Sequence, residues 1–254
     1  MGKSYVFVNQ KGGVGKTTSA INIGAFLAEA GKSVLLVDFD SQANLSSGVG
    51  IDKNRAKPGV YELISDLAPL EEVIKPTPVK GLSVIPADRD LAGAAVELID
   101  QEGRDYFLKN ALMPAKKKFD FILIDCPPSL GVLTLNGITA ADSILIPMQC
   151  EYFAMEGLTH LLETVKRVQK SINPKLTIGG IFFTMYDPRT RLAQQVVKEI
   201  GSYFANAVFS AIIPRNVRLS EAPSHGLPIS KYDPNCSGAK AYKSLAREVL
   251  NRGA

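Results

Sequence analysis

Short apolar runs alternate along this chain with longer stretches in which apolar residues recur every three or four positions. A short, uniformly apolar run is typical of a strand buried on both faces, and the second pattern is typical of a helix with one face in the core. The expected strands are residues 5–9, 33–38, 82–86, 121–125, 143–147, 178–184 and 208–213. The expected helices are residues 17–30, 131–140, 154–172, 192–204 and 238–250. The Pro- and charge-rich region 50–80 is interpreted as a surface excursion with one or two short helices.

The alternation of strands and helices predicts crossover connections between neighbouring strands. The fold class is therefore α/β, with a mostly parallel, twisted sheet flanked by helices on both faces. No linker, repeat or low-complexity segment divides the 254 residues, and this length suits one large core, so residues 1–254 are expected to form a single domain.

Several features of the sequence point to a cytoplasmic protein. No apolar run approaches the roughly 20 residues that a membrane-spanning helix needs. The first residues pass into an expected strand without the pattern of a signal peptide. The three cysteines, Cys126, Cys150 and Cys236, cannot all pair within one chain, which fits a reducing compartment.

The first expected strand leads directly into a segment rich in Gly and Lys, and a helical pattern follows at once. Glycines let the backbone turn tightly, so that several N–H groups point into one anion-sized hollow at the start of the helix. Lys16 can reach the β- and γ-phosphates of a nucleotide, and the Thr17 hydroxyl can bind Mg²⁺. The pattern predicts a P-loop NTPase that uses ATP and Mg²⁺. The nucleotide-binding residues expected here are Lys11, Gly12, Gly13, Val14, Gly15, Lys16, Thr17 and Thr18.

Acidic residues stand at the ends of two further expected strands. One strand ends in Asp38, with Asp40 two residues later, and another ends in Asp125. Ligands of an open parallel sheet bind outside the carboxyl ends of the strands, so these side chains are expected to face the P-loop. One carboxylate there can hold Mg²⁺ through its water shell, and another can orient the water that attacks the γ-phosphorus.

The phosphate-binding segment departs from the general pattern G-x-x-x-x-G-K-[ST] in two ways. Gln10 occupies the position of the pattern's first glycine, and Lys11 is an additional lysine. The form K-G-G-V-G-K-T-T resembles the deviant Walker A box of the ParA/MinD ATPases. Three more segments, D-C-P-P-S-L-G at 125–131, T-M-Y-D-P-R-T at 184–190 and I-P-R-N-V-R-L-S-E-A-P-S at 213–224, are similar to the ParA/Soj chromosome-partitioning proteins. Family members more often have Pro and Gly where this chain has Ser41 and Ala43.

This resemblance covers nearly the whole chain and implies a slow ATPase that acts as a switch. In the family, ATP closes a sandwich homodimer, the dimer binds double-stranded DNA without sequence preference, and a ParB-type centromere-binding protein stimulates hydrolysis. The resemblance therefore implies a cytoplasmic protein that associates with the nucleoid.

The same resemblance assigns roles to individual residues. It implies that Lys11 crosses the dimer interface to the partner's nucleotide, and that Lys16 acts with it in catalysis. Asp40 takes the water-positioning role, Asp125 the Walker B role, and Asp38 a supporting contact to the metal bound by Thr17. Pro214 and Asn216 are expected near the adenine.

Charge is unevenly distributed along the chain. Residues 1–150 carry 15 Lys and Arg against 17 Asp and Glu, whereas residues 151–254 carry 14 against 8, a net charge of +6. From Arg189 onward the count is 10 against 4. Such asymmetry suggests a polyanionic partner, although a solvated basic face explains the charge alone equally well. The resemblance points to Arg189 and Arg218 as DNA contacts, and Lys231, Lys240, Lys243 and Arg247 are weaker additions.

Three other functions remain as alternatives. A MinD-like, membrane-associated ATPase that positions the division site needs a C-terminal amphipathic anchor, but the apolar residues of 239–254 form a stripe expected to face the core, and no membrane partner is expected. A reductase like the nitrogenase iron protein needs two cysteines placed to share an Fe–S cluster, and the spacing of Cys126 and Cys150 does not match. A metabolic P-loop kinase or ligase leaves the basic C-terminal third unexplained.

Overall fold

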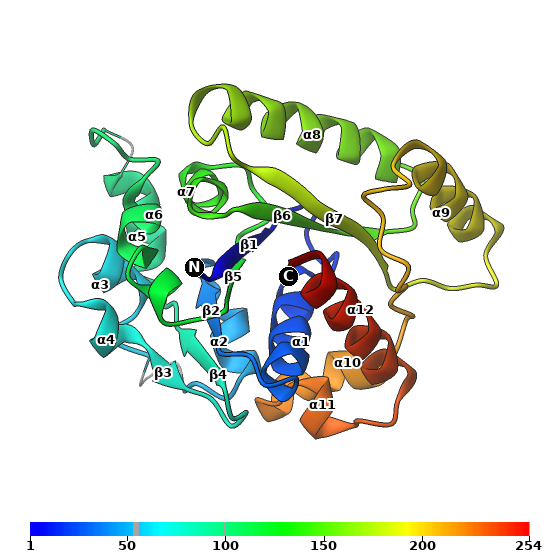
Figure 1. Ribbon diagram of the computed structural model, residues 1–254, viewed down its shortest axis with the longest axis horizontal. Helices are drawn as coiled ribbons and strands as arrows, with labels where there is room; N and C mark the ends of the chain where they lie inside the picture. The colour runs from blue at the N-terminus through cyan, green and yellow to red at the C-terminus, as the bar shows by residue number, and fades with distance from the viewer. Residues whose placement is uncertain (53–55, 99, 254) are drawn as a thin grey trace.

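The sheet at the centre of the protein has seven strands in the order β3-β4-β2-β5-β1-β6-β7 (Figure 1). The structure is a computed structural model that describes residues 1–52, 56–98 and 100–253. Neighbouring strands run parallel, except that β3 is antiparallel to β4. The strands are β1 (Lys3–Phe7), β2 (Val34–Asp38), β3 (Lys75–Pro76), β4 (Leu82–Ile85), β5 (Phe121–Asp125), β6 (Ser143–Gln149) and β7 (Thr177–Thr184).

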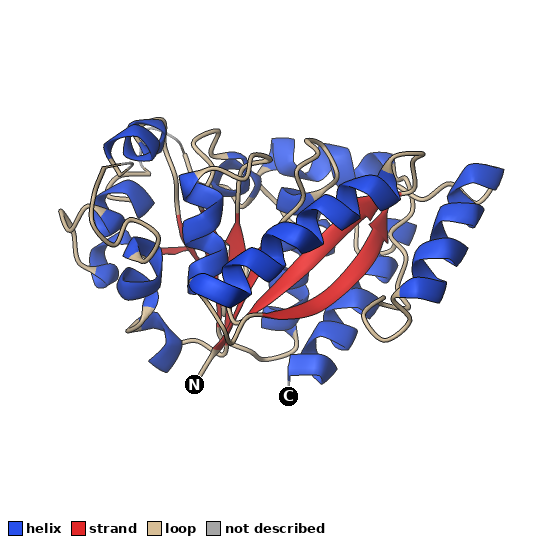
Figure 2. Ribbon diagram, turned by 90° about the horizontal axis from the view of Figure 1, so that it is seen from above, coloured by secondary structure: helices blue, strands red, loops and turns tan. Residues whose placement is uncertain are grey.

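Helices cover both faces of this sheet, which confirms the predicted α/β class (Figures 1 and 2). One face is covered by α1 (Lys16–Glu29), α2 (Asn44–Gly48), α10 (Val217–Glu221), α11 (Ile229–Tyr232) and α12 (Ser237–Gly253). The other face is covered by α3 (Val60–Ile64), α4 (Leu70–Val73), α5 (Leu91–Glu97), α6 (Phe107–Leu112), α7 (Val132–Ala140), α8 (Ala154–Ser171) and α9 (Arg191–Tyr203). Two 3-10 helices, η2 (Ala115–Lys117) and η3 (Ala222–His225), complete the described elements.

The central strand β5 shows why the strands are apolar throughout. Successive side chains of a strand point to opposite faces. Phe121 and Leu123 pack in the core beneath α1 and α12, whereas Ile122 and Ile124 pack in the core on the other face. Both sets are buried, so a polar residue on either face would lack a hydrogen-bonding partner.

The apolar stripe of the C-terminal helix faces the core, as its spacing predicts. Tyr242, Leu245 and Val249 of α12 are buried in the cluster that also contains the inner face of α1. The hydroxyl oxygens of Tyr242 and Ser19 lie 2.9 Å apart and join the two helices. Within the described part of the chain, no helix is both long enough and apolar enough to cross a bilayer.

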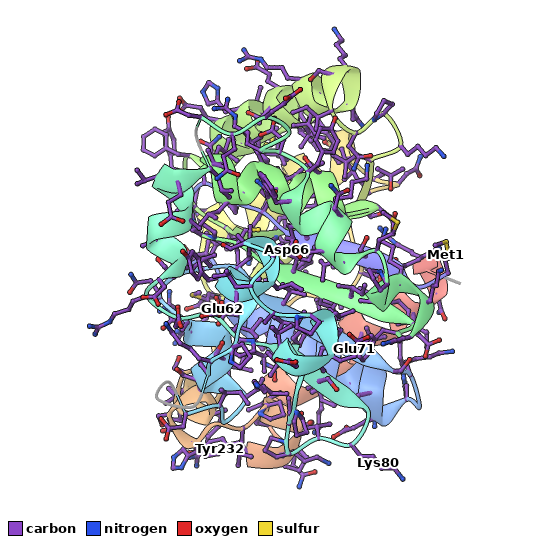
Figure 3. All side chains as sticks on the ribbon, turned by 90° about the vertical axis from the view of Figure 1, so that its left-hand side faces the viewer. Met1, Glu62, Asp66, Glu71, Lys80 and Tyr232 are labelled. Atoms are coloured by element: carbon purple, nitrogen blue, oxygen red, sulfur yellow. The ribbon has the colours of Figure 1, made fainter. Side chains whose placement is uncertain are left out.

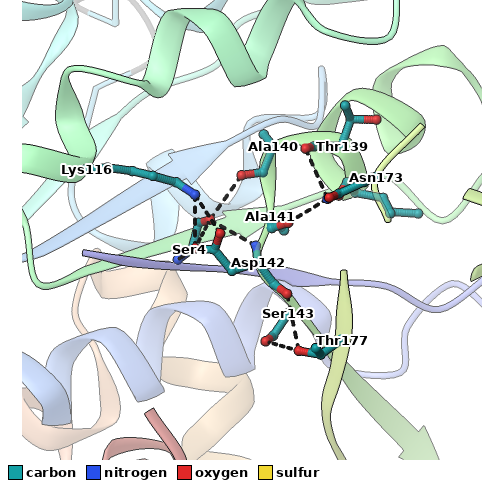
Figure 4. Close-up of polar contacts among 10 residues, drawn as sticks. Ser4, Lys116, Thr139, Ala140, Ala141, Asp142, Ser143, Asn173 and Thr177 are labelled. Carbon is teal, nitrogen blue, oxygen red and sulfur yellow. Dashed lines mark hydrogen bonds and ion pairs between the residues drawn. The ribbon is translucent and has the colours of Figure 1, made fainter. Parts of the chain in front are cut away.

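A network of hydrogen bonds joins residues at the amino ends of the strands, which lie at the edge of the sheet opposite the P-loop (Figure 4). The backbone N–H and the hydroxyl of Ser4 both donate to Oδ2 of Asp142, at 2.8 Å each. Lys116 donates to Oδ1 of the same carboxylate at 2.8 Å. Asn173 donates to the carbonyl of Ala141 at 2.9 Å, and thereby ties the end of α8 to the start of β6. This network fixes β1 against β6, and so fixes the strand from which the P-loop starts.

The prediction of a strand at residues 208–213 is wrong. In the structure this segment follows the edge of β7 through isolated contacts at Val208 and Pro214. Between them, the N–H groups of Ser210 and Ala211 donate instead to the two carboxylate oxygens of Glu248, at 2.8 Å each. A side chain of α12 therefore replaces a strand partner, so no continuous ladder forms.

Elsewhere the structure confirms the expected elements, with small shifts at their ends. The first strand begins and ends two residues earlier than expected, and β6 continues to Gln149. Region 50–80 contains the two short helices α3 and α4. The sequence patterns did not predict β3, which has only two residues and includes Pro76 at the edge of the sheet. They also did not predict the short helices α2, α5, α6, α10 and α11.

Glu248 provides a test of this packing. Replacing Glu248 with Ala leaves two N–H groups without their acceptor, one of them on buried Ala211, so the free energy of unfolding is expected to fall by about 1–3 kcal/mol. The measurement is urea unfolding followed by circular dichroism. Glu199→Ala on the exposed face of α9 is the control and should stay within about 0.5 kcal/mol of the parent. Equal stability of the two variants would contradict the role given to Glu248.

Candidate active site

The P-loop joins β1 to α1 through a backbone conformation that glycine allows. Gly13 and Gly15 have φ angles of +73° and +87°, in the left-handed region where other residues are strained. A side chain added at Gly12 or Gly13 would meet no atom within 4 Å, so the space beside the loop is open. The loop therefore presents its backbone, together with the N-terminal end of α1, to an open hollow of the kind that binds phosphate.

Lys16 is held along the inside of this loop. Its side chain is buried, with 7% of the residue exposed, and its ammonium donates to the carbonyls of Asn9 (3.2 Å) and Lys11 (3.4 Å). Burial lowers the pKa of Lys16, while the carboxyl of Asp125 partly offsets that effect. The structure thus places a single cation at the floor of the phosphate hollow.

Thr17 and Asp125 meet beside Lys16 and fit a magnesium site. The Thr17 hydroxyl donates to Oδ2 of Asp125 at 2.6 Å, whereas Oδ1 of Asp125 is buried without a hydrogen-bonding partner among the described residues. Burial, and secondarily the charge of Asp38, raise the pKa of Asp125 to about 8. A divalent cation favours the ionised carboxyl and would use its free oxygen together with the Thr17 hydroxyl. Mg²⁺ held there would neutralise charge that develops on the phosphates.

Asp38 lies beside Asp125, because the two residues are paired in the register of β2 and β5. Its oxygens already accept hydrogen bonds, from the N–H of Ser46 (2.8 Å), the hydroxyl of Ser46 (2.6 Å) and the N–H of Asp40 (3.3 Å). Burial raises the pKa of Asp38 to about 6, and Ser46 opposes that shift. Asp38 therefore anchors the loop that follows β2, and its contact with the metal stays a prediction.

Asp40 starts the turn that leads from β2 to α2. Its Oδ1 accepts from the N–H of Gln42 at 3.0 Å, and its carbonyl accepts from the N–H of Ala43 at 2.9 Å. Ala43 has a φ of +53°, in the left-handed region that glycine adopts more readily than alanine. The carboxyl of Asp40 is half-buried at the same edge of the sheet as the P-loop, as predicted, and its action on the attacking water is untested.

Lys11, the additional lysine of the P-loop, lies on the surface. It forms an ion pair with Glu151, and slightly more than half of each side chain is exposed, 52% and 54%. The two residues stand at a pocket of about 200 Å³ that is otherwise lined mainly by apolar side chains of the P-loop, β6 and α8. Glu151 was not among the residues expected at the site, although its position four residues after the expected strand 143–147 could have indicated it.

A second pocket, of about 250 Å³, opens next to the start of α1. Gly15 and Thr18 line one part of it, and Pro214, Asn216 and Tyr242 line another. Asn216 accepts from the N–H of Arg218 at 2.8 Å and donates to the hydroxyl of Ser237 at 2.9 Å, so its amide is held in a fixed orientation. The pocket has room for a base next to the phosphate hollow, in agreement with the positions expected for Pro214 and Asn216. Tyr242 was expected only as part of the core-facing stripe of residues 239–254, and no sequence motif marks it as part of this pocket.

The arginines expected to contact DNA form local ion pairs. Arg189, in the loop after β7, binds Asp187 through two nitrogens at 2.9 and 2.7 Å and lowers the pKa of that carboxyl to about 2. Arg218, in α10, lies 2.9 Å from Glu221 and 3.5 Å from Asp233.

Of the four other cations expected to contact DNA, one forms an ion pair and three lie along one side of α12. Lys231 pairs with Glu29 at 3.0 Å. Lys240, Lys243 and Arg247 are exposed along one side of α12, and the described residues offer them no ion pair.

Known proteins resemble this chain over its whole length. Residues 2–178 match a protein family described as an AAA domain. The chain is 62% identical over 252 residues to the chromosome-partitioning ATPase Soj of Treponema pallidum (strain Nichols), which covers 99% of this chain and 98% of the relative. It is 53% identical over 253 residues to the sporulation initiation inhibitor protein Soj of Bacillus subtilis (strain 168), with full coverage of both chains.

Among solved structures, the chain is similar to the cobyrinic acid a,c-diamide synthase from Mycobacterium smegmatis with bound ATP analog and magnesium. The TM-score is 0.88 and the sequence identity is 37%, and the match covers 99% of this chain and 95% of that chain. The P-loop, the buried lysine and the free carboxylate oxygen account for ATP and Mg²⁺ as the cofactors of an ATPase. The chain belongs to the Soj/ParA family of chromosome-partitioning ATPases.

Proposed function

We propose that this ATPase partitions DNA as an ATP-dependent switch: ATP closes a homodimer, the dimer binds double-stranded DNA without sequence preference, and hydrolysis releases it. Residues 1–254 act as one unit in this cycle. The observation that carries the proposal is the contrast between two lysines of one loop. Lys16 is buried over the phosphate hollow of its own chain, whereas Lys11 stands at the surface, where a second chain can meet it.

The surface around Lys11 supports a dimer contact. Tyr152 and Phe153 follow Glu151 directly, are 77% and 70% exposed, and pack edge to face with ring centroids 5.0 Å apart. Exposed aromatic side chains are enriched at protein interfaces, since they bury a large area at low entropic cost. The ammonium of Lys11 would leave Glu151 for the more strongly charged phosphates of the partner's nucleotide.

The arrangement of charge supports DNA binding at the C-terminal part of the chain. Figure 3 shows Glu62, Asp66 and Glu71 on the side of the protein formed by α3 and α4. In Figure 1 that side lies opposite α9 and α12, which follow the loop of Arg189 and carry much of the basic excess. A C-terminal part with a net charge of +6, in which Lys240, Lys243 and Arg247 have no ion pair among the described residues, is suited to hold a polyanion.

A ParB-type, centromere-binding partner is proposed to accelerate hydrolysis, because a partner can supply charge that stabilises the transition state of phosphoryl transfer. The protein would act in the cytoplasm on nucleoid DNA. A MinD-like membrane role is less well supported, since the apolar stripe of α12 is buried against α1.

Lys16 and Asp40 separate nucleotide binding from hydrolysis. Lys16→Ala removes a charge that contacts phosphate in both ground and transition states, so ATP affinity is expected to fall by about 10- to 100-fold. Asp40→Ala should retain ATP binding, lower turnover by about 100-fold or more, and trap the dimer. Labelled-nucleotide titration and phosphate release measure the two effects. Asp100→Ala, an exposed control, should resemble the parent, and parent-like turnover in Asp40→Ala would refute the role of Asp40.

Lys11→Ala tests the dimer contact. The variant should bind ATP as a monomer and lose ATP-stimulated DNA binding, because Lys11 contacts the partner's nucleotide and not its own. Light scattering of each protein with ATP and with ADP measures the mass. Lys80→Ala removes an exposed lysine near the side shown in Figure 3 and should leave the ATP dimer intact. An unchanged ATP dimer of Lys11→Ala excludes the proposed contact.

Arg218→Ala tests the DNA surface. If Arg189 and Arg218 each neutralise one phosphate per protomer, the dimer makes about four contacts and log affinity falls with log salt at a slope of about −3.6. Between ~50 and ~200 mM salt the loss is then roughly a hundredfold. Arg218→Ala should keep the ATP dimer, weaken DNA binding and flatten the slope by about one to two units.

The measurement is an anisotropy titration with two unrelated duplexes at several salt concentrations. Arg89→Ala changes an exposed arginine between Asp88 and Asp90, outside the C-terminal part, and is the matched control that should preserve both affinity and slope. A strong preference for one duplex, or binding that ignores salt, would count decisively against the proposal.

A further inference from the structure

Two side chains from neighbouring strands hold the carbonyl groups of the P-loop. Thr184, the last residue of β7, donates its hydroxyl to the carbonyl of Val14 at 2.8 Å. The Met148 carbonyl is farther away, at 3.2 Å, so the single hydroxyl hydrogen serves Val14. Gln149, the last residue of β6, donates from Nε2 to the carbonyl of Gly13 at 3.1 Å. Two consecutive peptide groups of the loop are thus fixed by residues outside it.

These contacts determine where the loop's N–H groups point. In a planar trans peptide, the C=O of one residue and the N–H of the next point in opposite directions. Holding the Gly13 carbonyl toward Gln149 turns the N–H of Val14 away from β6, and holding the Val14 carbonyl toward Thr184 turns the N–H of Gly15 away from β7. Neither N–H has a hydrogen-bond acceptor among the described residues. Both are therefore available to an anion in the open hollow beside the loop.

The loop needs such anchors because its own residues restrain it poorly. Gly13 and Gly15 have left-handed φ angles, and glycine reaches many other conformations at little cost. The hydroxyl of Thr184 lies in a residue that is only 2% exposed, so water competes little for its hydrogen bond. The second hydrogen of the Gln149 amide goes to Sδ of Met185 at 3.0 Å, and Met185 itself has a strained φ of +50°. The anchors therefore belong to a locally strained, ordered arrangement at the ends of β6 and β7.

We propose that Thr184 and Gln149 are positioning residues of the ATPase, which aim the N–H groups of Val14 and Gly15 at the phosphates of the nucleotide. They act through the P-loop, and their own polar groups stay on its carbonyls. Their contribution is a preorganised phosphate site, so their loss weakens binding of the phosphate chain and leaves binding of the base unchanged.

Substitutions at Thr184 separate this role from packing. Thr184→Val keeps the size of the side chain, which also lines the base pocket, and removes only the hydroxyl. The affinity for labelled ADP is expected to fall about tenfold, as for the loss of one well-aimed charge-assisted hydrogen bond. The affinity for adenosine, measured by competition, should stay within about twofold. Thr184→Ser keeps the hydroxyl and should restore ADP binding. Thr177→Val, the same change at the other end of β7, is the matched control and should bind ADP like the parent.

Gln149→Leu provides a second variant at a half-buried position, so the proposal can be tested even if Thr184→Val fails to fold. It should also weaken ADP binding more than adenosine binding, and for both variants KM for ATP should rise more than kcat falls. Parent-like ADP affinity in Gln149→Leu and in any folded Thr184→Val would overturn the proposal. Equal losses of ADP and adenosine affinity, or equal losses in Thr184→Ser and Thr184→Val, would also overturn it, because they indicate packing alone.

Discussion

Two carboxyl groups, Asp38 and Asp125, are buried side by side at the carboxyl ends of β2 and β5, and the rest of the site is arranged around that pair. Burial raises the pKa of both carboxyl groups, and the charge of Asp38 raises the pKa of Asp125 further. The two carboxyl groups differ in the hydrogen bonds that they receive. Asp38 receives the hydrogen bonds of Ser46, whereas Asp125 keeps one oxygen free and faces Thr17 and Lys16. Asp125, whose Oδ1 has no hydrogen-bonding partner among the described residues, is therefore the carboxyl proposed to bind Mg²⁺.

The same chemical group serves different purposes in this protein according to its burial. Lys16 and Lys11 lie five residues apart in one loop, yet one is packed over the phosphate hollow and the other is exposed to solvent beside Glu151. A charge in a confined space contributes strongly to affinity, while an exposed ion pair contributes little and is easily exchanged. A single short loop thus contains one buried lysine and one lysine in an exposed ion pair.

The sequence predicted the P-loop, the acidic strand ends and most strands, because their patterns are local. Glycines beside Lys16, or an apolar run that ends in Asp125, are visible within ten residues. The sequence could not predict contacts between distant segments. Glu248 replaces a strand partner some 37 residues away, and Glu151 pairs with a residue 140 positions earlier. Thr184 reaches the P-loop across 170 residues, and only the order of the strands brings them together.

Residues 151–254 carry a net charge of +6, whereas residues 1–150 carry a net charge of −2. Lys240, Lys243 and Arg247 lie along one side of α12 without an ion pair among the described residues, whereas Glu62 of α3 and Glu71 of α4 are paired with Lys57 and Lys118. In the field of a long polyanion, such a molecule experiences a torque before any atoms touch, and it arrives with its basic end leading. Dissolved ions screen this field over a Debye length of about 8 Å at physiological ionic strength. As the salt concentration rises, the polyanion therefore orients the approaching protein less strongly. The geometry of the encounter is thereby partly determined before binding begins.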